Sequence, residues 1–137
     1  IIYDYDYYMK NNKQKKIYVN YNEKFDIYNL DKILKSNNEI IDKYLKNIDQ
    51  LHFLTKSLGA EPIFINQPAQ QDYFSEKLFA LNYSLIHHCE KKVYNCVDLV
   101  KELKATNDFW WDGVHTTPKG SRAIADEIFP KLINFLN

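Results

Sequence analysis

The chain of 137 residues is long enough for one domain with a single hydrophobic core. Its 18 Lys and Arg residues balance 18 Asp and Glu residues, so no net charge favours nucleic acid or an anionic membrane as a partner. The sequence predicts no membrane span, because no stretch approaches the roughly 18 consecutive apolar residues that a spanning helix needs. With three glycines, four prolines and no visible repeat, it also predicts no low-complexity linker.

The first 28 residues differ from the rest in composition. Seven of the eleven tyrosines lie here, mixed with lysine and asparagine. Because tyrosine alternating with aspartate has the period of a strand, we expect a strand fragment over Ile1–Tyr8 and a surface loop over Met9–Tyr28. Two interpretations of this tract stay open. It is either an aromatic platform with interleaved lysines that stacks sugars or bases, or a solvated insertion whose composition reflects AT-rich coding bias.

A long amphipathic helix is predicted over Asn38–Ser57. Apolar residues recur there at steps of three and four, which indicates one buried stripe; they are Ile40, Ile41, Tyr44, Leu45, Ile48, Leu51, His52 and Leu54. His52 is expected to be a partly buried packing residue on this stripe. Gly59 supplies the stop expected just past a helix C-terminus. The following run, Pro62–Ile65, is short and continuously apolar, which is typical of a parallel strand covered on both faces.

Two further helices alternate with one further strand. We expect a helix over Asp72–Glu90, a buried strand over Val93–Leu99 and a closing helix over Pro118–Leu136, in which Pro130 threatens a kink. Residues directed inward on the two helices are expected to be Phe74, Leu78, Leu81, Leu85 and Ile86, then Ile124, Ile128, Leu132 and Phe135. This alternation of helices and strands predicts α/β layering with a parallel sheet.

Polar residues follow both predicted strands. Asn66 and Gln67 come after the first strand, and Asp98 ends the second. Because ligands of parallel sheets bind beyond the carboxyl ends of the strands, we expect these loops to converge on the same edge as Asp112 and His115.

The stretch Asp112-Gly113-Val114-His115 carries the clearest chemical signal. A carboxylate three residues before an imidazole, on a loop that enters a helix, can accept a hydrogen bond from Nδ1–H, which fixes the tautomer and leaves Nε2 free to take a proton. Thr117 can cap the helix and Pro118 suits its first position. The alternatives are a histidine that caps the helix or packs on the neighbouring tryptophans, and an ordinary Asp-Gly turn.

This segment resembles the C-terminal block of the SGNH (GDSL-type) hydrolases, in which an Asp-x-x-His pair before the last helix serves a serine nucleophile. The order of the upstream helices and strands agrees with the second half of that family, and the likeness covers roughly Ile40–Leu136. The resemblance implies a three-layer αβα, flavodoxin-like fold with a parallel sheet. It implies one partial domain over residues 1–137, with a strand fragment and loop over 1–28 and helix-strand-helix-strand-helix over 29–137.

The sequence departs from the family in its first half. No Gly-Asp-Ser motif, oxyanion-hole glycine or Gly-x-Asn-Asp motif is present, and the serines at 36, 57, 75, 84 and 121 lie in other contexts. The chain also starts with Ile1 in what reads as a strand. We therefore expect the N-terminal half of the fold to be missing from this segment, together with the nucleophile, so that the fragment alone is inactive.

The resemblance implies a serine-dependent ester hydrolase or acyltransferase that acts on a small acyl ester, such as an O-acetyl group on a carbohydrate. His115 would be the general base and Asp112 its orienting group. The expected partner is a small-molecule or carbohydrate ester, and this chemistry needs no metal or organic cofactor. An alternative from another class stays open: a non-catalytic binding or scaffolding module that kept the fold and lost its nucleophile.

Other residues near the predicted site carry weaker signals. The side-chain amides of Asn66 and Gln67 are candidates to bind substrate or to order the Asp112–His115 loop, and a structural turn before Pro68 is the alternative. One of the two tryptophans, for which Trp111 is our candidate, would wall the substrate pocket, while the other packs the loop onto the sheet.

The two cysteines are expected to be free, buried thiols. Cys89 falls at the end of a predicted helix and Cys96 within a predicted strand, so a bridge would require favourable geometry. His87 and His88 beside Cys89 suggest a zinc site. Adjacent histidines on a helix point about 100° apart, however, and no second ligand pair has a recognised spacing, so we expect no metal.

Overall fold

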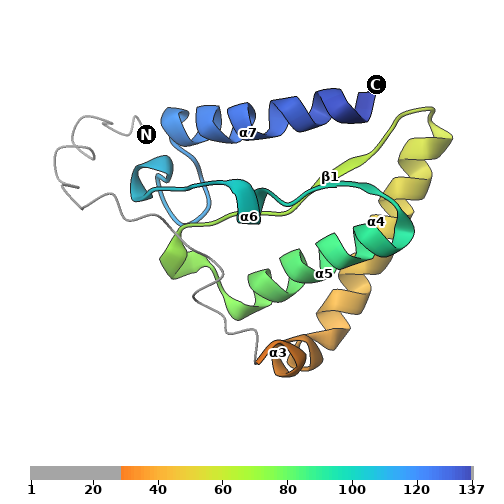
Figure 1. Ribbon diagram of the computed structural model, residues 1–137. Coiled ribbons are helices and arrows are strands. Elements are labelled where there is room, and N and C mark those ends of the chain that lie inside the picture. Colours follow the sequence, from red (N-terminus) through yellow and green to blue (C-terminus); the bar gives the residue numbers. More distant parts are fainter. Residues whose placement is uncertain (1–28, 137) are drawn as a thin grey trace, which may run out of the picture.

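The computed structural model describes residues 29–136, so the strand fragment and loop predicted over 1–28 lie outside the described residues. In chain order the elements are α3 (Leu30–Ser36), α4 (Asn38–Ser57), β1 (Ile63–Ile65), the 3₁₀ helix η2 (Gln71–Tyr73), α5 (Glu76–Lys92), β2 (Asn95–Val97), α6 (Leu99–Glu102), the 3₁₀ helix η3 (Asn107–Phe109) and α7 (Pro118–Leu136). The described part is a mixed α/β structure, mostly helical, with a small two-stranded sheet (Figure 1).

The predicted helices are confirmed, with shifts that local capping explains. Helix α4 has the predicted bounds, and Gly59 follows it with a positive φ of 77°. Helix α5 begins four residues later than predicted because the Ser75 hydroxyl accepts the N–H of Leu78, 3.1 Å away. The last helix begins at Pro118 as predicted and continues through Pro130.

The two strands are shorter than predicted. Val93 takes a left-handed conformation, with φ of 58°, and ends α5, so β2 begins only at Asn95. After Val97 the chain turns at once into α6, where Asp98 caps the first turn by accepting the N–H of Lys101. Each strand therefore keeps three residues.

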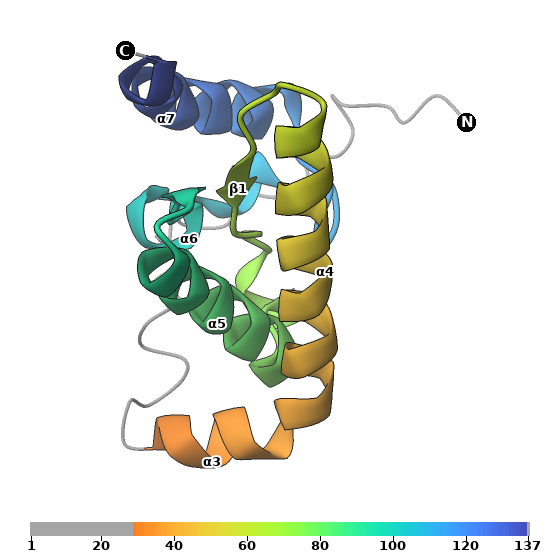
Figure 2. The same ribbon diagram turned by 90° about the vertical axis from the view of Figure 1, so that its right-hand side faces the viewer.

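The strands pair in parallel, as predicted, with Phe64 opposite Cys96 in the register. Figures 1 and 2 both show the strand pair between α7 on one side and α5 on the other, while α4 runs past β1 and along α5. Ile63 packs against the core beneath α7, and Phe64 packs on the side of α4 and α5. The prediction that β1 is covered on both faces holds only in part, because Ile65 is 38% exposed.

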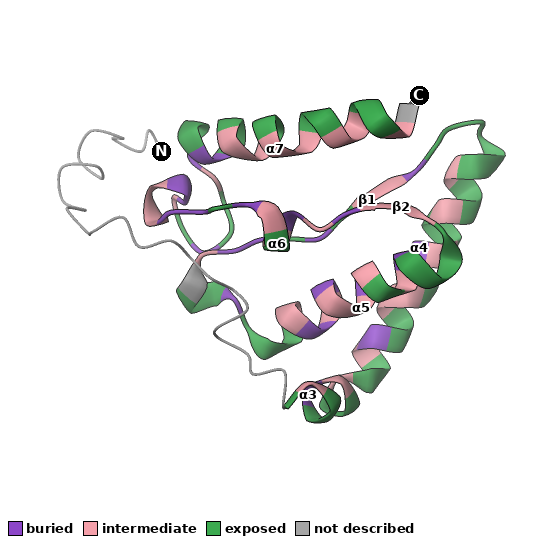
Figure 3. Cartoon of the chain, viewed as in Figure 1, coloured by how far each residue is buried: buried purple, intermediate pink, exposed green. Residues whose placement is uncertain are grey.

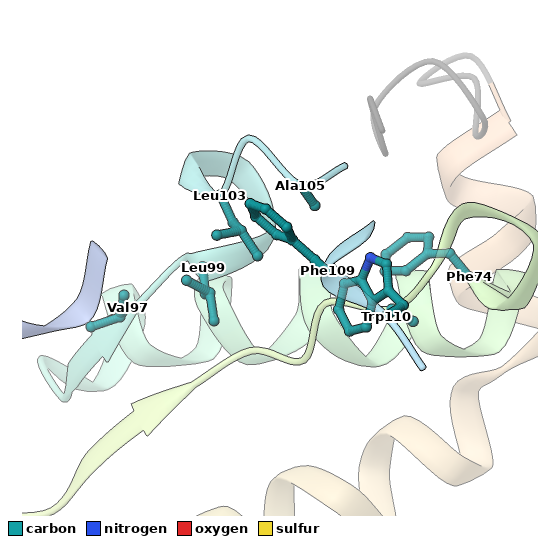
Figure 4. Close-up of a cluster of buried hydrophobic side chains, with 8 residues drawn as sticks. Phe74, Val97, Leu99, Leu103, Ala105, Phe109 and Trp110 are labelled. Atoms are coloured by element: carbon teal, nitrogen blue, oxygen red, sulfur yellow. The ribbon is translucent and has the colours of Figure 1, made fainter. Parts of the chain in front are cut away.

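The largest core cluster lies where α7 and η3 meet the loops that follow the strands. It consists of Ala69, Phe74, Val97, Leu99, Leu103, Ala105, Phe109 and Trp110 (Figure 4). Helix α7 adds Ile124, Ile128 and Phe135 to it, which are three of the four residues predicted to point inward. Phe74 and Trp110 are almost completely buried, so the loops that follow the strands pack against a close-packed core.

Two residues of the stripe predicted on α4, Leu51 and Leu54, are not buried. Ile41 and Ile48 are buried, whereas Leu51 and Leu54 are 53% and 55% exposed. Figure 3 shows buried, intermediate and exposed segments interleaved along α4. Helices α3 and α5 pack against the side of α4 that carries Ile41, Leu45 and Ile48. Periodicity therefore identified the helix but overestimated the width of its buried face.

The prediction of free thiols is also wrong, because Cys89 and Cys96 form a disulfide. The left-handed turn at Val93 reverses the chain between α5 and β2, and it brings the two Cα atoms within 6.2 Å, inside the usual range for a disulfide. The sequence does not reveal a turn of this kind, because β-branched residues rarely adopt a positive φ.

Candidate active site

Asp112 and His115 form a closed hydrogen-bonded turn before α7. One oxygen of the Asp112 carboxylate, Oδ1, accepts the backbone N–H groups of Val114 and His115 at 2.9 and 2.8 Å. The other, Oδ2, lies 2.7 Å from Nδ1 of His115. Since an ionised carboxylate can only accept, the proton of the neutral imidazole sits on Nδ1, and Nε2 carries the free lone pair. This is the geometry that the sequence pattern predicted.

The electrostatics of the turn keep its carboxylate charged. The backbone N–H groups of His115 and Val114, followed by the His115 side chain, lower the pKa of Asp112 from 3.8 to about 2. The His115 side chain is 76% exposed, and its Nε2 makes no hydrogen bond within the described part of the chain. The dyad thus presents a proton-accepting nitrogen to the outside of the molecule.

Backbone bonds on both sides close the base of the turn. The N–H of Trp111 donates to the carbonyl of His115 at 2.8 Å, and Trp110 and Thr116 form an antiparallel bridge. The N–H of Thr117 donates to the carbonyl of Phe109, also at 2.8 Å. The loop therefore leaves the core and returns to it as a short, paired ribbon.

The start of α7 supports this ribbon. As predicted, Thr117 caps the helix: its hydroxyl accepts the N–H of Gly120 at 3.2 Å and donates to the carbonyl of Asp108 at 2.8 Å. A Cβ at Gly120 would lie 2.2 Å from the carbonyl oxygen of Phe109, so the absence of a side chain lets α7 sit directly against η3.

An ion pair that sequence reasoning missed fastens the same junction. The Asp108 carboxylate accepts hydrogen bonds from the Thr106 hydroxyl and the Lys119 ammonium. Partial burial raises the pKa of Asp108, but these hydrogen bonds outweigh it and hold the pKa below its ordinary value. The sequence contains no signal for this pair, because Asp108 and Lys119 are eleven positions apart and belong to different elements, η3 and α7.

The loop after β1 meets the Asp112–His115 turn, as predicted. The N–H of Gln70 donates to the carbonyl of Gly113 at 2.9 Å, and the amide of Asn66 donates to the Asp98 carboxylate at 2.7 Å. The ends of both strands and the turn thus converge on one edge of the sheet, because the strands are parallel.

The two amide residues of this loop have different environments. Asn66 is buried, and its side-chain oxygen also accepts the N–H of Val100 at 3.0 Å. This geometry favours the alternative given for Asn66, a structural role in the turn before Pro68. Gln67 has an exposed side chain, while its backbone N–H and carbonyl are both bound by the Asn82 side chain at 3.0 and 2.8 Å. Gln67 therefore projects from a fixed backbone.

The two tryptophans differ in how far they are buried. Trp110 is 1% exposed and belongs to the main core cluster, as predicted for one of the pair. Trp111 is half-buried on the ribbon beside the dyad.

Four serine hydroxyls of the described chain bond to groups other than His115. Ser36, Ser57 and Ser75 bond within or between helices, and Ser121 lies 2.7 Å from the hydroxyl of Thr116. The three other histidines have partners of their own: His88 pairs with Asp49, His87 pairs with Glu90, and His52 stacks on the ring of Tyr94. Within residues 29–136, no group of three or more His, Cys, Asp or Glu side chains is placed to hold a metal ion.

Helices on both sides of a parallel strand pair, with an Asp–His dyad at the carboxyl edge of the strands, place the described part of the chain among α/β proteins. A family model described as GDSL-like Lipase/Acylhydrolase matches residues 6–128 of the 137. The chain belongs to this family, the SGNH hydrolases, and the dyad residues lie inside the match. Searches of curated proteins and of solved structures found no match.

The family match covers more of the chain than the resemblance predicted from sequence. It begins at residue 6, before the predicted start at Ile40, and it ends at residue 128 within α7. Among the described helices, none combines the length and apolar character that crossing a membrane requires.

Proposed function

We propose that the protein is a serine-dependent ester hydrolase, or an acyltransferase of the same chemistry, in which His115 is the general base and Asp112 orients it. The observation that carries the proposal is the 2.7 Å contact between Asp112 Oδ2 and His115 Nδ1, with Nε2 turned outward. Membership of an acylhydrolase family supports an ester as the substrate.

The reaction proceeds through an acyl-enzyme. His115 Nε2 removes the proton from a serine hydroxyl as the serine oxygen attacks the ester carbonyl, and backbone N–H groups stabilise the oxyanion. The imidazolium returns that proton to the leaving alkoxide as the ester C–O bond breaks. Water, or an acceptor alcohol in a transferase, then attacks the acyl-serine with His115 again as base. The serine and the oxyanion hole would come from a segment outside residues 1–137.

Throughout this cycle the role of Asp112 is to orient and stabilise His115. Its carboxylate holds Nδ1–H, selects the tautomer with a basic Nε2 and stabilises the imidazolium that forms after proton transfer. Because the backbone N–H groups hold Oδ1, the carboxylate cannot rotate away when the imidazole becomes charged.

A small acyl ester, such as an O-acetyl group on a carbohydrate, is the proposed substrate. Gln67 and Trp111 are the candidates to contact it, because one presents an exposed amide from a fixed backbone and the other lies beside the dyad. Asn66 would contribute indirectly, through its bond to Asp98, by holding the loop that carries Gln67.

The test is hydrolysis of p-nitrophenyl acetate by the full-length protein. His115→Ala should lower kcat/KM by about 10² to 10⁴, the usual contribution of a general base. His87→Ala is the matched control, because His87 is also an exposed histidine paired with an acidic residue, on α5. Equal rates for His115→Ala and the wild-type protein would remove His115 from the mechanism.

Labelling separates the enzyme from the non-catalytic alternative. A fluorophosphonate should modify one serine of the full-length protein, and mass spectrometry should place it outside residues 1–137. A full-length protein that neither hydrolyses esters nor reacts with the reagent would favour a binding or scaffolding module.

A further inference from the structure

Tyr73 covers the middle of the Asp112–His115 turn. A Cβ built on Gly113 would lie 2.3 Å from both Cδ1 and Cγ of Tyr73 and 2.8 Å from Cε1, so the aromatic ring rests on the backbone of Gly113. Gly113 is accordingly buried, although Asp112, Val114 and His115 around it are exposed.

This contact explains why a glycine occupies position 113. Among the described glycines, only Gly59 has a positive φ, so the backbone of Gly113 takes a conformation open to other residues. What excludes a side chain is the ring of Tyr73. The contact is therefore specific to this pair and does not follow from the Asp-Gly turn itself.

The segment that carries Tyr73 is itself held firmly. The N–H groups of Tyr73 and Phe74 both donate to the carbonyl of Gln70, at 2.9 and 3.0 Å, and the Gln70 N–H donates to the carbonyl of Gly113. Phe74 is fully buried in the main core cluster. The Tyr73 ring thus packs on the turn from a segment that Phe74 anchors in the core.

The ring contributes little to the core, because 62% of Tyr73 is exposed. The dyad, in contrast, needs support, since both of its side chains stand largely in solvent and the hydrogen bond between them competes with water. A loose turn would let Nε2 swing away from the reacting hydroxyl, and small displacements of a catalytic group cost large factors in rate.

We propose that Tyr73 is a positioning residue that holds the Asp112–His115 dyad in its reactive geometry by packing its ring on Gly113. The apolar surface of the ring does this, and the hydroxyl takes no part. This inference rests on the proposed function only for its effect on rate; the packing of the ring on the turn stands independently of any activity.

The first experiment is NMR spectroscopy of the full-length protein, with Tyr73→Phe, Tyr73→Ala and the control Phe53→Ala. Phe53 is a 71% exposed aromatic residue on α4. An aromatic ring over Gly113 shifts its Hα resonances upfield, and the Asp112 bond shifts the His115 Nδ1–H resonance downfield. Both signatures should persist in the wild-type protein, Tyr73→Phe and Phe53→Ala. In Tyr73→Ala the Gly113 shift should vanish, and the Nδ1–H resonance should broaden through exchange with water.

The second experiment measures kcat and KM for p-nitrophenyl acetate. Tyr73→Ala should lower kcat by about tenfold to a hundredfold with KM within about twofold, as expected for a misplaced catalytic group. Tyr73→Phe and Phe53→Ala should retain the wild-type kcat. Gly113→Ala, which displaces the ring without removing it, should reproduce the loss in kcat.

Other outcomes overturn the inference. Unchanged Gly113 and His115 resonances in Tyr73→Ala would show that the ring does not hold the turn. A raised KM with unchanged kcat would make Tyr73 a substrate contact, and a loss in Tyr73→Phe equal to that in Tyr73→Ala would assign the role to the hydroxyl. A wild-type protein without esterase activity would sink the proposed function, while the NMR signatures would still decide the role of Tyr73.

Discussion

Asp112 shows how one side chain can organise a site through contacts that are all local. Its two oxygens engage three donors within three residues, and two of those donors are backbone N–H groups of the turn. The carboxylate therefore shapes the backbone and orients the imidazole at the same time. A conventional surface pair of Asp and His would depend on the side chains alone and would be weakly held.

The pKa of Asp112 should reveal which donors matter most. Because the backbone N–H groups of His115 and Val114 contribute most to the shift from 3.8 to about 2, His115→Ala should leave the Asp112 pKa well below 3.8. A carboxyl group with a lowered pKa stabilises the folded state above its ordinary pKa, and this contribution is lost as the pH falls from 3.8 toward about 2.

Titration of the Asp112 carboxyl carbon, followed by NMR, measures the pKa of Asp112 in the wild-type protein and in His115→Ala. Val114→Ala is the control, because it keeps the backbone N–H and removes an exposed side chain. A pKa near 3.8 in His115→Ala would show instead that the imidazole alone keeps Asp112 charged.

At the scale of elements, the site depends on how closely α7 approaches η3. The capping hydroxyl of Thr117 bonds to both elements, and Lys119 on α7 pairs with Asp108 on η3. Gly120 lies at the closest point, against the carbonyl of Phe109. Since His115 is two residues from Thr117, any shift of the helix moves the dyad as well.

Gly120→Ala should therefore destabilise the protein. Alanine is the better helix former, but its Cβ would lie 2.2 Å from a backbone oxygen that cannot rotate away. We expect a loss of about 1 to 3 kcal/mol in the free energy of unfolding, as for other overpacked sites. Urea denaturation measures it, with Arg122→Ala on the exposed side of α7 as the control. A more stable Gly120→Ala protein would mean that α7 does not pack against η3 in this way.

At the scale of the whole molecule, the two ends of the strand pair carry different groups of residues. The carboxyl ends carry the dyad, whereas cross-links gather near the amino end of β2. There the Asp49 carboxylate on α4 lies 2.7 Å from His88 Nε2 on α5 and accepts the Tyr94 hydroxyl at 3.0 Å. The ring of Tyr94 stacks on His52 at 3.8 Å, as expected for a packing histidine.

Burial raises the pKa of Asp49, but the hydrogen bonds from His88 and Tyr94 and the charges of His88 and Lys92 outweigh it and lower the pKa below 3.8. Burial, followed by the hydrogen bond to Asp49 and the charge of that carboxylate, raises the pKa of Tyr94. This cluster and the disulfide together fasten α4 and α5 to β2 at the end of the molecule away from the dyad.

The disulfide should contribute to global stability without affecting the chemistry. Cys89 and Cys96 are seven residues apart, and closing a loop of this size stabilises a protein by about 2 kcal/mol in the chain-entropy estimate. Dithiothreitol should lower the free energy of unfolding of the wild-type protein by that amount and leave the double variant Cys89→Ser/Cys96→Ser unchanged. Esterase activity at room temperature should be the same with and without reductant. Two titratable thiols in the unreduced, denatured protein would contradict the bridge.

Much of the fold and the central part of the site could be predicted from sequence because they depend on short separations. The period of apolar residues identified α4 and α7, Thr117 and Pro118 marked the start of α7, and the turn from Asp112 to His115 needs only three residues to close. Such contacts depend mainly on local backbone geometry and on spacing along the chain.

Contacts between distant segments were beyond the reach of sequence patterns. The ring of Tyr73 on Gly113, the pairing of Asp108 with Lys119 and the bridge between Cys89 and Cys96 depend on how finished elements dock, and so does the exposure of Leu51. The sequence by itself determined the three longest helices, α4, α5 and α7, and the dyad, because those interactions are local. Only the tertiary structure decided what supports the dyad and which apolar residues are buried, because docking depends on the shapes of whole surfaces that no short pattern encodes.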